Sequence, residues 1–235
     1  MRSGQRVGAL GVAPGVLTIV GPLVAYLGLV PPIVGFVLFA GGGILAVVLA
    51  LGAIVRLVRG RGLTLGSGVS LLVALVFVGL IVAGGDHPRI NDFTTDTNDP
   101  PALTFAATLP DSHGRDLSYP PAFAAVQQQC CADLRTVQLP VPPAEALERV
   151  RRLAEAQPCW RITHTDVAAG TVEAIATSRL FHFQDDIVLR VRPGADGGSL
   201  VDMRSKSRVG QGDMGANAAR IRQFMVALRT TGATS

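Results

Sequence analysis

The stretch that decides the fold of the C-terminal half is Ile187-Val-Leu-Arg-Val-Arg-Pro-Gly-Ala-Asp-Gly-Gly-Ser-Leu-Val-Asp-Met-Arg-Ser-Lys206. Apolar and polar residues alternate on both sides of a glycine-rich turn, which is typical of two half-buried strands joined as a hairpin. The pattern sends one set of side chains toward a core, namely Ile187, Leu189, Val191, Val201 and Met203. It sends Arg190, Arg192, Asp202 and Arg204 to the opposite face.

The same alternation extends outward from this hairpin. It predicts strands over residues 136–139, 160–166, 171–177, 187–192 and 199–206. Apolar residues at helical spacing predict helices over 143–156 and 213–229. In the second helix, we expect Met214 on the face toward the core and Asp213 as the N-cap. The order is β-α-β-β-β-β-α. Short turns between consecutive strands favour an antiparallel sheet, and two helices covering one face make an α+β domain over residues 135–230, with a tail at 231–235.

The first 85 residues have a different character. No charged residue occurs from Val7 to Val55 or from Gly62 to Gly85, and a membrane-spanning helix takes about 20 residues. We therefore predict a transmembrane anchor over residues 1–85 with helices at about 9–29, 33–55 and 63–82, the Pro31-Pro32 pair forming the turn of a hairpin. Within a chain of net charge +4, residues 1–85 hold five arginines and no acidic residue, so the basicity belongs to the anchor and does not indicate nucleic-acid binding.

The arginines predict the orientation of the anchor. Arg2 and Arg6 precede the first helix, and Arg56, Arg59 and Arg61 lie between the second and third. The positive-inside rule places both groups in the cytoplasm, so three spans deliver the C-terminal domain to the outer side. A cleaved signal peptide is the alternative, but its apolar region is roughly 7–15 residues long and this apolar run is far longer. No ionisable residue lies in the middle of a span, which argues against a transporter.

Residues 86–134 are rich in Asp, Thr and Pro and predict an extended linker, with a short helix at 122–129. Asp92, Asp96, Asn98 and Asp99 form an oxygen-rich group within it. Their spacing does not fit the EF-hand loop, so turn-forming side chains are the favoured interpretation over a cation site.

Four stretches carry a resemblance to a known family: Ile90–Pro101, Phe183–Pro193, Val201–Gly210 and Asp213–Ile221. Together with the three apolar segments, they make the chain similar to the domain-of-unknown-function family 1499. The resemblance implies a membrane-anchored or exported α+β domain of bacteria, hence a location at the cytoplasmic membrane with the domain on its periplasmic side. It brings no established activity, cofactor or catalytic residue.

The densest polar group of the domain supplies the candidate binding residues. One interpretation is an anion or lipid head-group site on the sheet, because arginine pairs well with phosphate and carboxylate. The favoured alternative is a cross-strand ladder of charges on a solvated face. The residues are Asp185, Asp186, Arg190, Asp202, Arg204, Arg208 and Asn217.

Catalytic and metal chemistry find little support in the sequence. His182 with Asp185 and Asp186 is the best hydrolase candidate, and His164 with Asp166 lacks a third metal ligand. Gly210–Gly215 matches G-x-G-x-x-G but stands in no βαβ unit. We therefore predict no catalytic residue, no metal and no cofactor.

Three cysteines, Cys130, Cys131 and Cys159, would face an oxidising compartment. A bridge from one of the adjacent pair to Cys159 is expected there if the geometry allows it. The function predicted from all these features is a membrane-anchored, non-catalytic binding module for a lipid-like ligand or an envelope partner. An envelope hydrolase and a structural subunit of a membrane complex are the alternatives.

Overall fold

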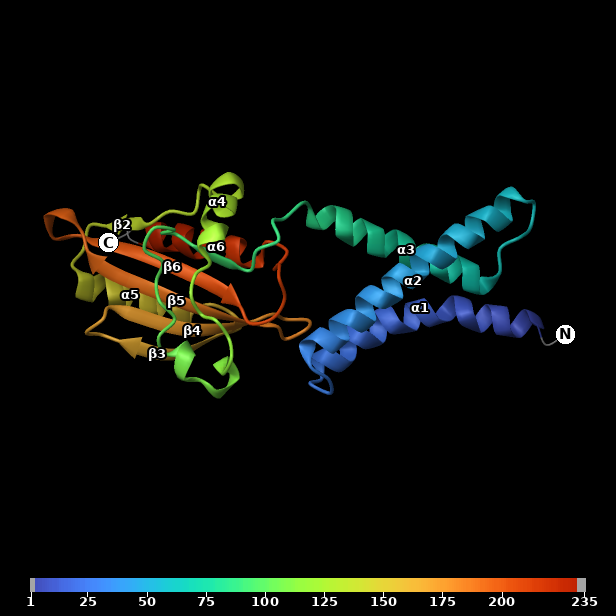
Figure 1. The fold of residues 1–235 in the computed structure, drawn as a ribbon, viewed down its shortest axis with the longest axis horizontal. Helices are drawn as coiled ribbons and strands as arrows, with labels where there is room; N and C mark the ends of the chain where they lie inside the picture. The colour runs from blue at the N-terminus through green and yellow to red at the C-terminus, as the bar shows by residue number, and fades with distance from the viewer. Residues whose placement is uncertain (1–2, 232–235) are drawn as a thin grey trace. The chain divides into compact units, whose positions relative to one another are not determined.

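The computed structural model describes residues 3–231, which form two compact units (Figure 1). A helical unit comprises the residues up to 86 together with 179–182, and a sheet domain comprises 87–178 and 183 onward. Arg2 and most of the predicted tail, residues 232–235, lie outside the described residues.

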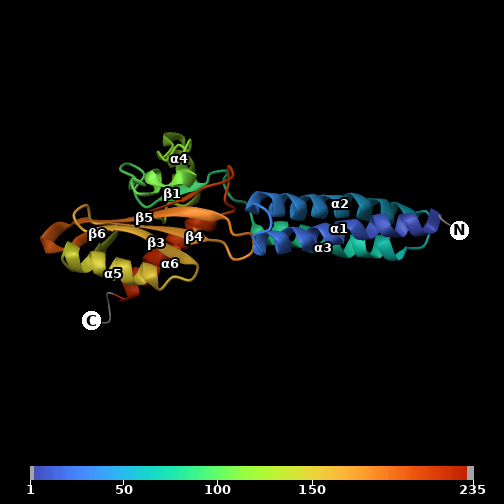
Figure 2. The ribbon, with the colours of Figure 1, turned by 90° about the horizontal axis from the view of Figure 1, so that it is seen from below.

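The helical unit consists of α1 (Ser3–Tyr26), α2 (Pro32–Val58) and α3 (Leu65–Gly84), which lie side by side (Figures 1 and 2). Pro31 precedes α2, and Pro32 occupies its first turn, where the missing N–H costs nothing. Two of the three helices, α2 and α3, are long and apolar enough to cross a membrane, each with a mean hydropathy of 2.6. The apolar part of α1 that the structure describes, Gly11–Tyr26, is shorter than a span.

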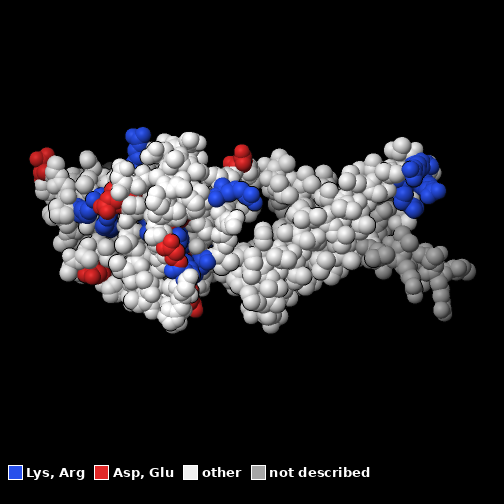
Figure 3. Space-filling model, viewed as in Figure 1, with Lys and Arg blue, Asp and Glu red and all other residues white. Residues whose placement is uncertain are grey.

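Charged side chains on the described helices gather where α2 leads into α3. The face in view is otherwise uncharged along the three helices (Figure 3). The charged side chains at this junction are the arginines of the 56–61 segment, the first of which lies in the last turn of α2. Since no charged residue occurs from Val7 to Val55 or from Gly62 to Gly85, the helices offer only apolar or neutral side chains to their surroundings along most of their length.

Glycines allow α1 and α2 to approach closely. A Cβ atom on Gly21 would lie 2.5 Å from the carbonyl oxygen of Gly35, and a Cβ on Gly35 would lie 2.5 Å from the Cβ of Ala25. Gly52, by contrast, has open space around it. Close approach through small residues is the usual way in which membrane helices pack without a hydrophobic driving force.

Substitution of Gly21 by Val should therefore destabilise the helical unit, because the added side chain meets backbone atoms that cannot move aside. We expect the melting temperature of the detergent-solubilised full chain to fall by several degrees. Gly52→Val, at an open position in the same environment, is the matched control and should leave the melting temperature unchanged. Equal melting temperatures for the two variants would contradict this packing.

The sheet domain is built on one antiparallel sheet with the strand order β1-β6-β5-β4-β3. Strand β2 also pairs with β6, along residues 199–201, whereas β1 pairs with residues 204–206. The strands are β1 (Asp92–Thr94), β2 (Val137–Leu139), β3 (Trp160–Asp166), β4 (Thr171–Thr177), β5 (Gln184–Pro193) and β6 (Ser199–Ser207). The helices are α4 (Pro121–Cys130), α5 (Pro143–Glu155) and α6 (Ala216–Thr231), with single 3-10 turns η1 (Ala106–Thr108), η2 (Pro110–Ser112) and η3 (Ala195–Gly197). The antiparallel α+β architecture follows the order expected from residue 136 onward.

Helices α5 and α6 cover one face of the sheet and enclose the hydrophobic core (Figure 2). The alternation correctly predicts its sheet residues, since Ile187, Leu189, Val201 and Met203 are fully buried there. The prediction was wrong for Met214, which is exposed with φ at 55°, because Asp213 caps the helix by accepting from the backbone N–H groups of Gly215 and Asn217. Helix α6 consequently begins at Ala216.

The segment 86–134, expected as a linker, is an integral part of the sheet domain. Its strand β1 pairs antiparallel with β6 in the register Asp92↔Lys206, and its helix α4 packs on β1. Gln127 of α4 is buried and holds the backbone of Thr94, accepting from its N–H at 3.0 Å and donating to its carbonyl oxygen at 2.6 Å. Local composition predicts a linker here because many partners of this segment are polar groups about 70 to 112 residues away in the sequence.

Candidate functional site

The second face of the sheet carries the charged residues that alternate with the core. They lie on β4, β5 and β6 and point away from α5 and α6. Residues 95–118, here named the covering segment, run across this face (Figure 1). The covering segment adds a small apolar cluster in which Leu103, Ala106 and Leu117 pack on Val188. Most of the charged face is therefore shielded from solvent, although the Arg192 side chain remains 36% exposed.

The deepest group on this face joins β1 to β6. Arg204 makes a two-pronged contact with Asp92, with its Nε 2.9 Å from Oδ1 and its Nη2 2.8 Å from Oδ2, and Lys206 donates to the same Oδ2 at 2.9 Å. Arg204 also donates to the carbonyl oxygens of Pro101 and Leu117 in the covering segment, at 3.1 and 2.8 Å. Since Asp92 is fully buried and Arg204 nearly so, each charge depends on these partners.

A second group lies around Asp202, which is fully buried. Its carboxylate accepts from the guanidinium groups of Arg190 at 3.1 Å and Arg192 at 2.7 Å. The same two arginines reach Asp99 of the covering segment, at 3.0 and 3.2 Å, and Arg192 also reaches Asp96. Burial acts to lower the pKa of Arg192, but the hydrogen bonds and charges of Asp202 and Asp96 outweigh it and raise that pKa, so the guanidinium stays charged.

Two further carboxylates complete this face. Asp186, nearly fully buried, accepts from Arg208 at 2.7 Å and forms an ion pair with Arg115 of the covering segment at 2.8 Å. Glu173 of β4 is equally buried, and it accepts from the Thr104 hydroxyl and from the backbone N–H groups at the start of η1, all within 2.8 Å. Strands β4, β5 and β6 thus each bind the covering segment through their own charged side chains.

The remaining two candidates lie on the helix face. Asp185 accepts from Arg220 of α6 at 2.6 Å, and Asn217 accepts from the Ser205 hydroxyl at 2.6 Å and donates to the Ser207 hydroxyl at 2.8 Å. This group fixes the first turns of α6 to the end of β6.

The structure therefore brings together five of the seven candidate residues and separates two. Asp186, Arg190, Asp202, Arg204 and Arg208 share the covered face, whereas Asp185 and Asn217 lie on the other. The ladder of cross-strand charges is present, with Arg190 opposite Asp202, but it lies under the covering segment and not in solvent. Every one of the seven side chains is engaged within the chain, so this face is an internal network and not an open anion site.

The geometry gives no support to the hydrolase alternative. Asp185 and Asp186 are consecutive in β5, so their side chains point to opposite faces, and each is held by an arginine. His182 lies in the loop before β5, with φ at 60°. These groups do not converge on one reacting atom, as acid–base catalysis requires.

The other sequence candidates also have structural roles. His164 stacks on Phe105 of the covering segment with ring centroids 4.7 Å apart, and Asp166 caps the following turn. Asp96 accepts from the backbone N–H groups of Asn98 and Asp99, which is the turn geometry favoured for this group. Among residues 3–231, no three His, Cys, Asp or Glu side chains are placed to hold a metal ion.

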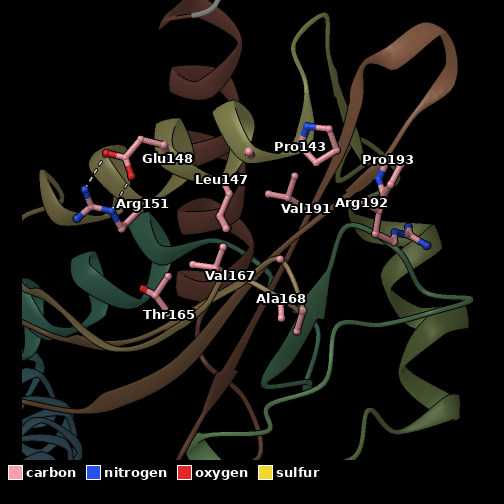
Figure 4. A pocket seen from close by; sticks show the side chains of 13 residues that line it. Pro143, Leu147, Glu148, Arg151, Thr165, Val167, Ala168, Val191, Arg192 and Pro193 are labelled. Carbon is pink, nitrogen blue, oxygen red and sulfur yellow. Dashed lines mark hydrogen bonds and ion pairs between the residues drawn. The ribbon is translucent and has the colours of Figure 1, made fainter.

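The described part of the domain also has hollows on its surface that are accessible from solvent, and the one beside α5 has a mostly apolar lining. A cavity of about 520 Å³ lies between α5, the β3–β4 turn and the end of β5 (Figure 4). Leu147, Val167 and Val191 line its apolar part, and the Glu148–Arg151 ion pair stands at its rim. Its size and lining are those of a small-ligand or side-chain pocket.

A comparison with protein-family models finds a match over residues 92–228 to the family described as a protein of unknown function, DUF1499. The chain belongs to this family. The matched region begins at Asp92, the first residue of β1 and the partner of Arg204, so it includes the covering segment as well as the sheet and its helices. A comparison with curated proteins finds no match.

Sequence reasoning missed several residues of the network, namely Asp92 as an ion-pair partner, Glu173, Arg115, Lys206 and Arg220. One signal was available for Glu173, the only charged residue within the predicted strand 171–177. Its position in the alternation assigned it to the polar face. No local pattern shows that this face is covered.

Replacing Arg204 by Met should destabilise the domain strongly, because it leaves Asp92 buried with only Lys206 as a cationic partner. Removing one partner of a buried pair costs about 3–5 kcal/mol. Denaturant unfolding of the full chain in detergent, followed by Trp160 fluorescence, measures this. Arg152→Met removes an exposed ion pair on α5 and serves as control, since such pairs contribute less than about 1 kcal/mol. An equal loss of unfolding free energy in the two variants would show that the Asp92–Arg204 pair contributes no more than an exposed ion pair.

Proposed function

We propose that this chain is an integral membrane protein that presents a non-catalytic binding domain on the outer side of the bacterial cytoplasmic membrane. The observation that carries the proposal is the apolar surface of the helical unit. Large aliphatic side chains there are exposed, for example Ile44 at 60%, Leu75 at 72% and Val82 at 74%. Side chains of this size and number find a favourable environment in lipid and not in water.

The proposed anchor has three spans, with α1 completing the pair formed by α2 and α3. Support comes from the packing of α1 against α2 through Gly21 and Gly35. The basic residues at the junction of α2 and α3 support a cytoplasmic position for that junction, whereas the Pro31-Pro32 turn carries no charge. With an odd number of spans, the sheet domain lies on the side opposite the N-terminus.

A reporter enzyme that is active only outside the cytoplasm tests this orientation. Fused after Ser235 it should be active, and inserted between Arg59 and Gly60 it should be inactive. Both fusions are checked for membrane insertion by extraction with alkaline carbonate, which should leave the protein in the pellet. The reverse pattern of activity, or release of the protein by carbonate, would overturn the proposed topology.

The binding role is supported by the contrast between the two parts of the domain. The charged groups of the covered face form ion pairs with one another and with the covering segment, whereas the cavity beside α5 is open and lined mostly by apolar side chains. We assign ligand or partner contact to this cavity, and a lipid-like molecule or an apolar side chain of an envelope protein would fit its chemistry.

A photo-crosslinking amino acid at position 167 tests the cavity in native membranes. Val167 lines it and is 76% exposed, so the substitution should not disturb the core. We expect a discrete adduct, whose mass distinguishes a lipid-like molecule from a protein. The same amino acid at Val209, an exposed valine outside the cavity, is the control. An identical adduct pattern at both positions, or none at 167, would refute a binding role for this cavity.

A further inference from the structure

The adjacent cysteines at the end of α4 form a group that the structural network does not explain. Cys130 is the last residue of α4 and is exposed, whereas Cys131 is buried in the main core. Their sulfur atoms lie 2.7 Å apart. This separation approaches the S–S bond length of about 2.05 Å. Adjacent Cα atoms are only about 3.8 Å apart, below the roughly 4.4 Å that a disulfide usually takes, so the closed ring is strained and easily reduced.

The surrounding backbone holds the two thiols in this arrangement. The Cys131 N–H donates to the Gln127 carbonyl oxygen at 2.8 Å, and the Leu134 N–H donates to the Cys131 carbonyl oxygen at 3.1 Å. Gln127 itself is fixed by its two hydrogen bonds to Thr94 of β1. Beyond the pair, Arg222 of α6 is bonded to Asp133, which ties the following turn to α6. Both sides of the Cys130–Cys131 peptide are therefore anchored.

The third cysteine is too far away to compete. Cys159 directly precedes β3, at the opposite edge of the sheet from β1, on which α4 packs. Four strand spacings of about 4.8 Å separate those two strands by roughly 19 Å. A disulfide needs Cα atoms within about 7 Å, so the expected bridge from Cys159 to the pair is not compatible with this fold.

We propose that Cys130 and Cys131 are a redox-active dithiol that closes to a vicinal disulfide by exchange with a disulfide-bearing oxidant. The Cys130 thiolate attacks a sulfur atom of the oxidant, forming a mixed disulfide and releasing one oxidant thiol. The Cys131 thiolate then attacks the Cys130 sulfur and releases the second thiol. Two electrons and two protons pass to the oxidant, and the chain loses two hydrogen atoms.

The order of attack follows from exposure. Cys130 faces solvent and can meet the oxidant, whereas Cys131 is reached only from within the chain. Burial raises the pKa of the Cys131 thiol to about 12, an effect that the thiol of Cys130 reinforces and that nearby Arg222 partly opposes. Cys131 is thus a poor nucleophile toward external reagents and acts second, where its proximity compensates for its small thiolate fraction. The outer compartment of the proposed topology would supply such an oxidant, but the chemistry itself does not depend on that topology.

Peptide mass spectrometry of the full chain in detergent tests the proposal. The reduced protein is incubated with oxidised glutathione, remaining thiols are alkylated, and the protein is digested with trypsin. Cleavage at arginine places both adjacent cysteines in peptide 116–135 and Cys159 in peptide 153–161. We expect peptide 116–135 to be lighter by two hydrogen atoms and to carry no alkyl group, while peptide 153–161 is alkylated.

Two variants and an unfolded control make the result decisive. Cys159→Ser should leave ring closure unchanged, and Cys131→Ser should instead accumulate the glutathione mixed disulfide at Cys130. In urea, closure should be several-fold slower, because the fold no longer holds the thiols together. A covalent link between the two peptides, full alkylation of peptide 116–135, a stable mixed disulfide in the unmodified chain, or equally fast closure in urea would each overturn the proposal.

Discussion

The structure depends on the burial of Asp92 together with Arg204. An isolated charge in a protein interior is very costly, and this pair is stable there only because Lys206 and the carbonyl oxygens of Pro101 and Leu117 satisfy the remaining positions. The bond joins residues 112 positions apart and closes the domain between its first strand and its last. Without this ion pair, no buried charge pair would hold β1 against β6, and the start of the covering segment, which follows β1, would be less firmly fixed.

This constraint explains why one face of the sheet carries an apolar core and the other a network of charges. Strands alternate their side chains strictly, so a residue shift of one position would exchange the apolar core for the charged network. Both faces of the sheet are covered. Helices pack on the aliphatic residues of one face, and the covering segment, which has no long helix or strand, packs on the ion pairs of the other. The polar face specifies the register at least as strictly as the core does, because a misplaced charge in the interior is costlier than a misplaced methyl group.

The sequence predicts those helices and strands of the fold that depend on residues close together in the chain. Alternation locates the strands from 160 onward, proline and periodicity locate α5, and uncharged runs locate the three N-terminal helices. What it does not reveal is whether a polar face meets water or protein. Arg190 and Arg192 look like ordinary solvent-facing residues in the pattern, and only their ion pairs with Asp96 and Asp99 turn a surface ladder into a partly buried network. These ion pairs join residues about a hundred positions apart, which no period in a local window can show.

This distinction also changes where a function is to be sought. A cluster of arginines and carboxylates is often taken as a binding site because its charges look available, yet charge is available only when no partner inside the chain has already neutralised it. In this domain the buried carboxylates of Asp92, Asp186 and Asp202 are each paired with arginines of the same chain, so these charges stabilise the fold. Our proposals therefore rest on a mostly apolar hollow beside α5 and on two thiols at the end of α4. The arginines and carboxylates that suggest a binding site by their composition stabilise the fold, and the fold in turn positions the hollow and the thiols.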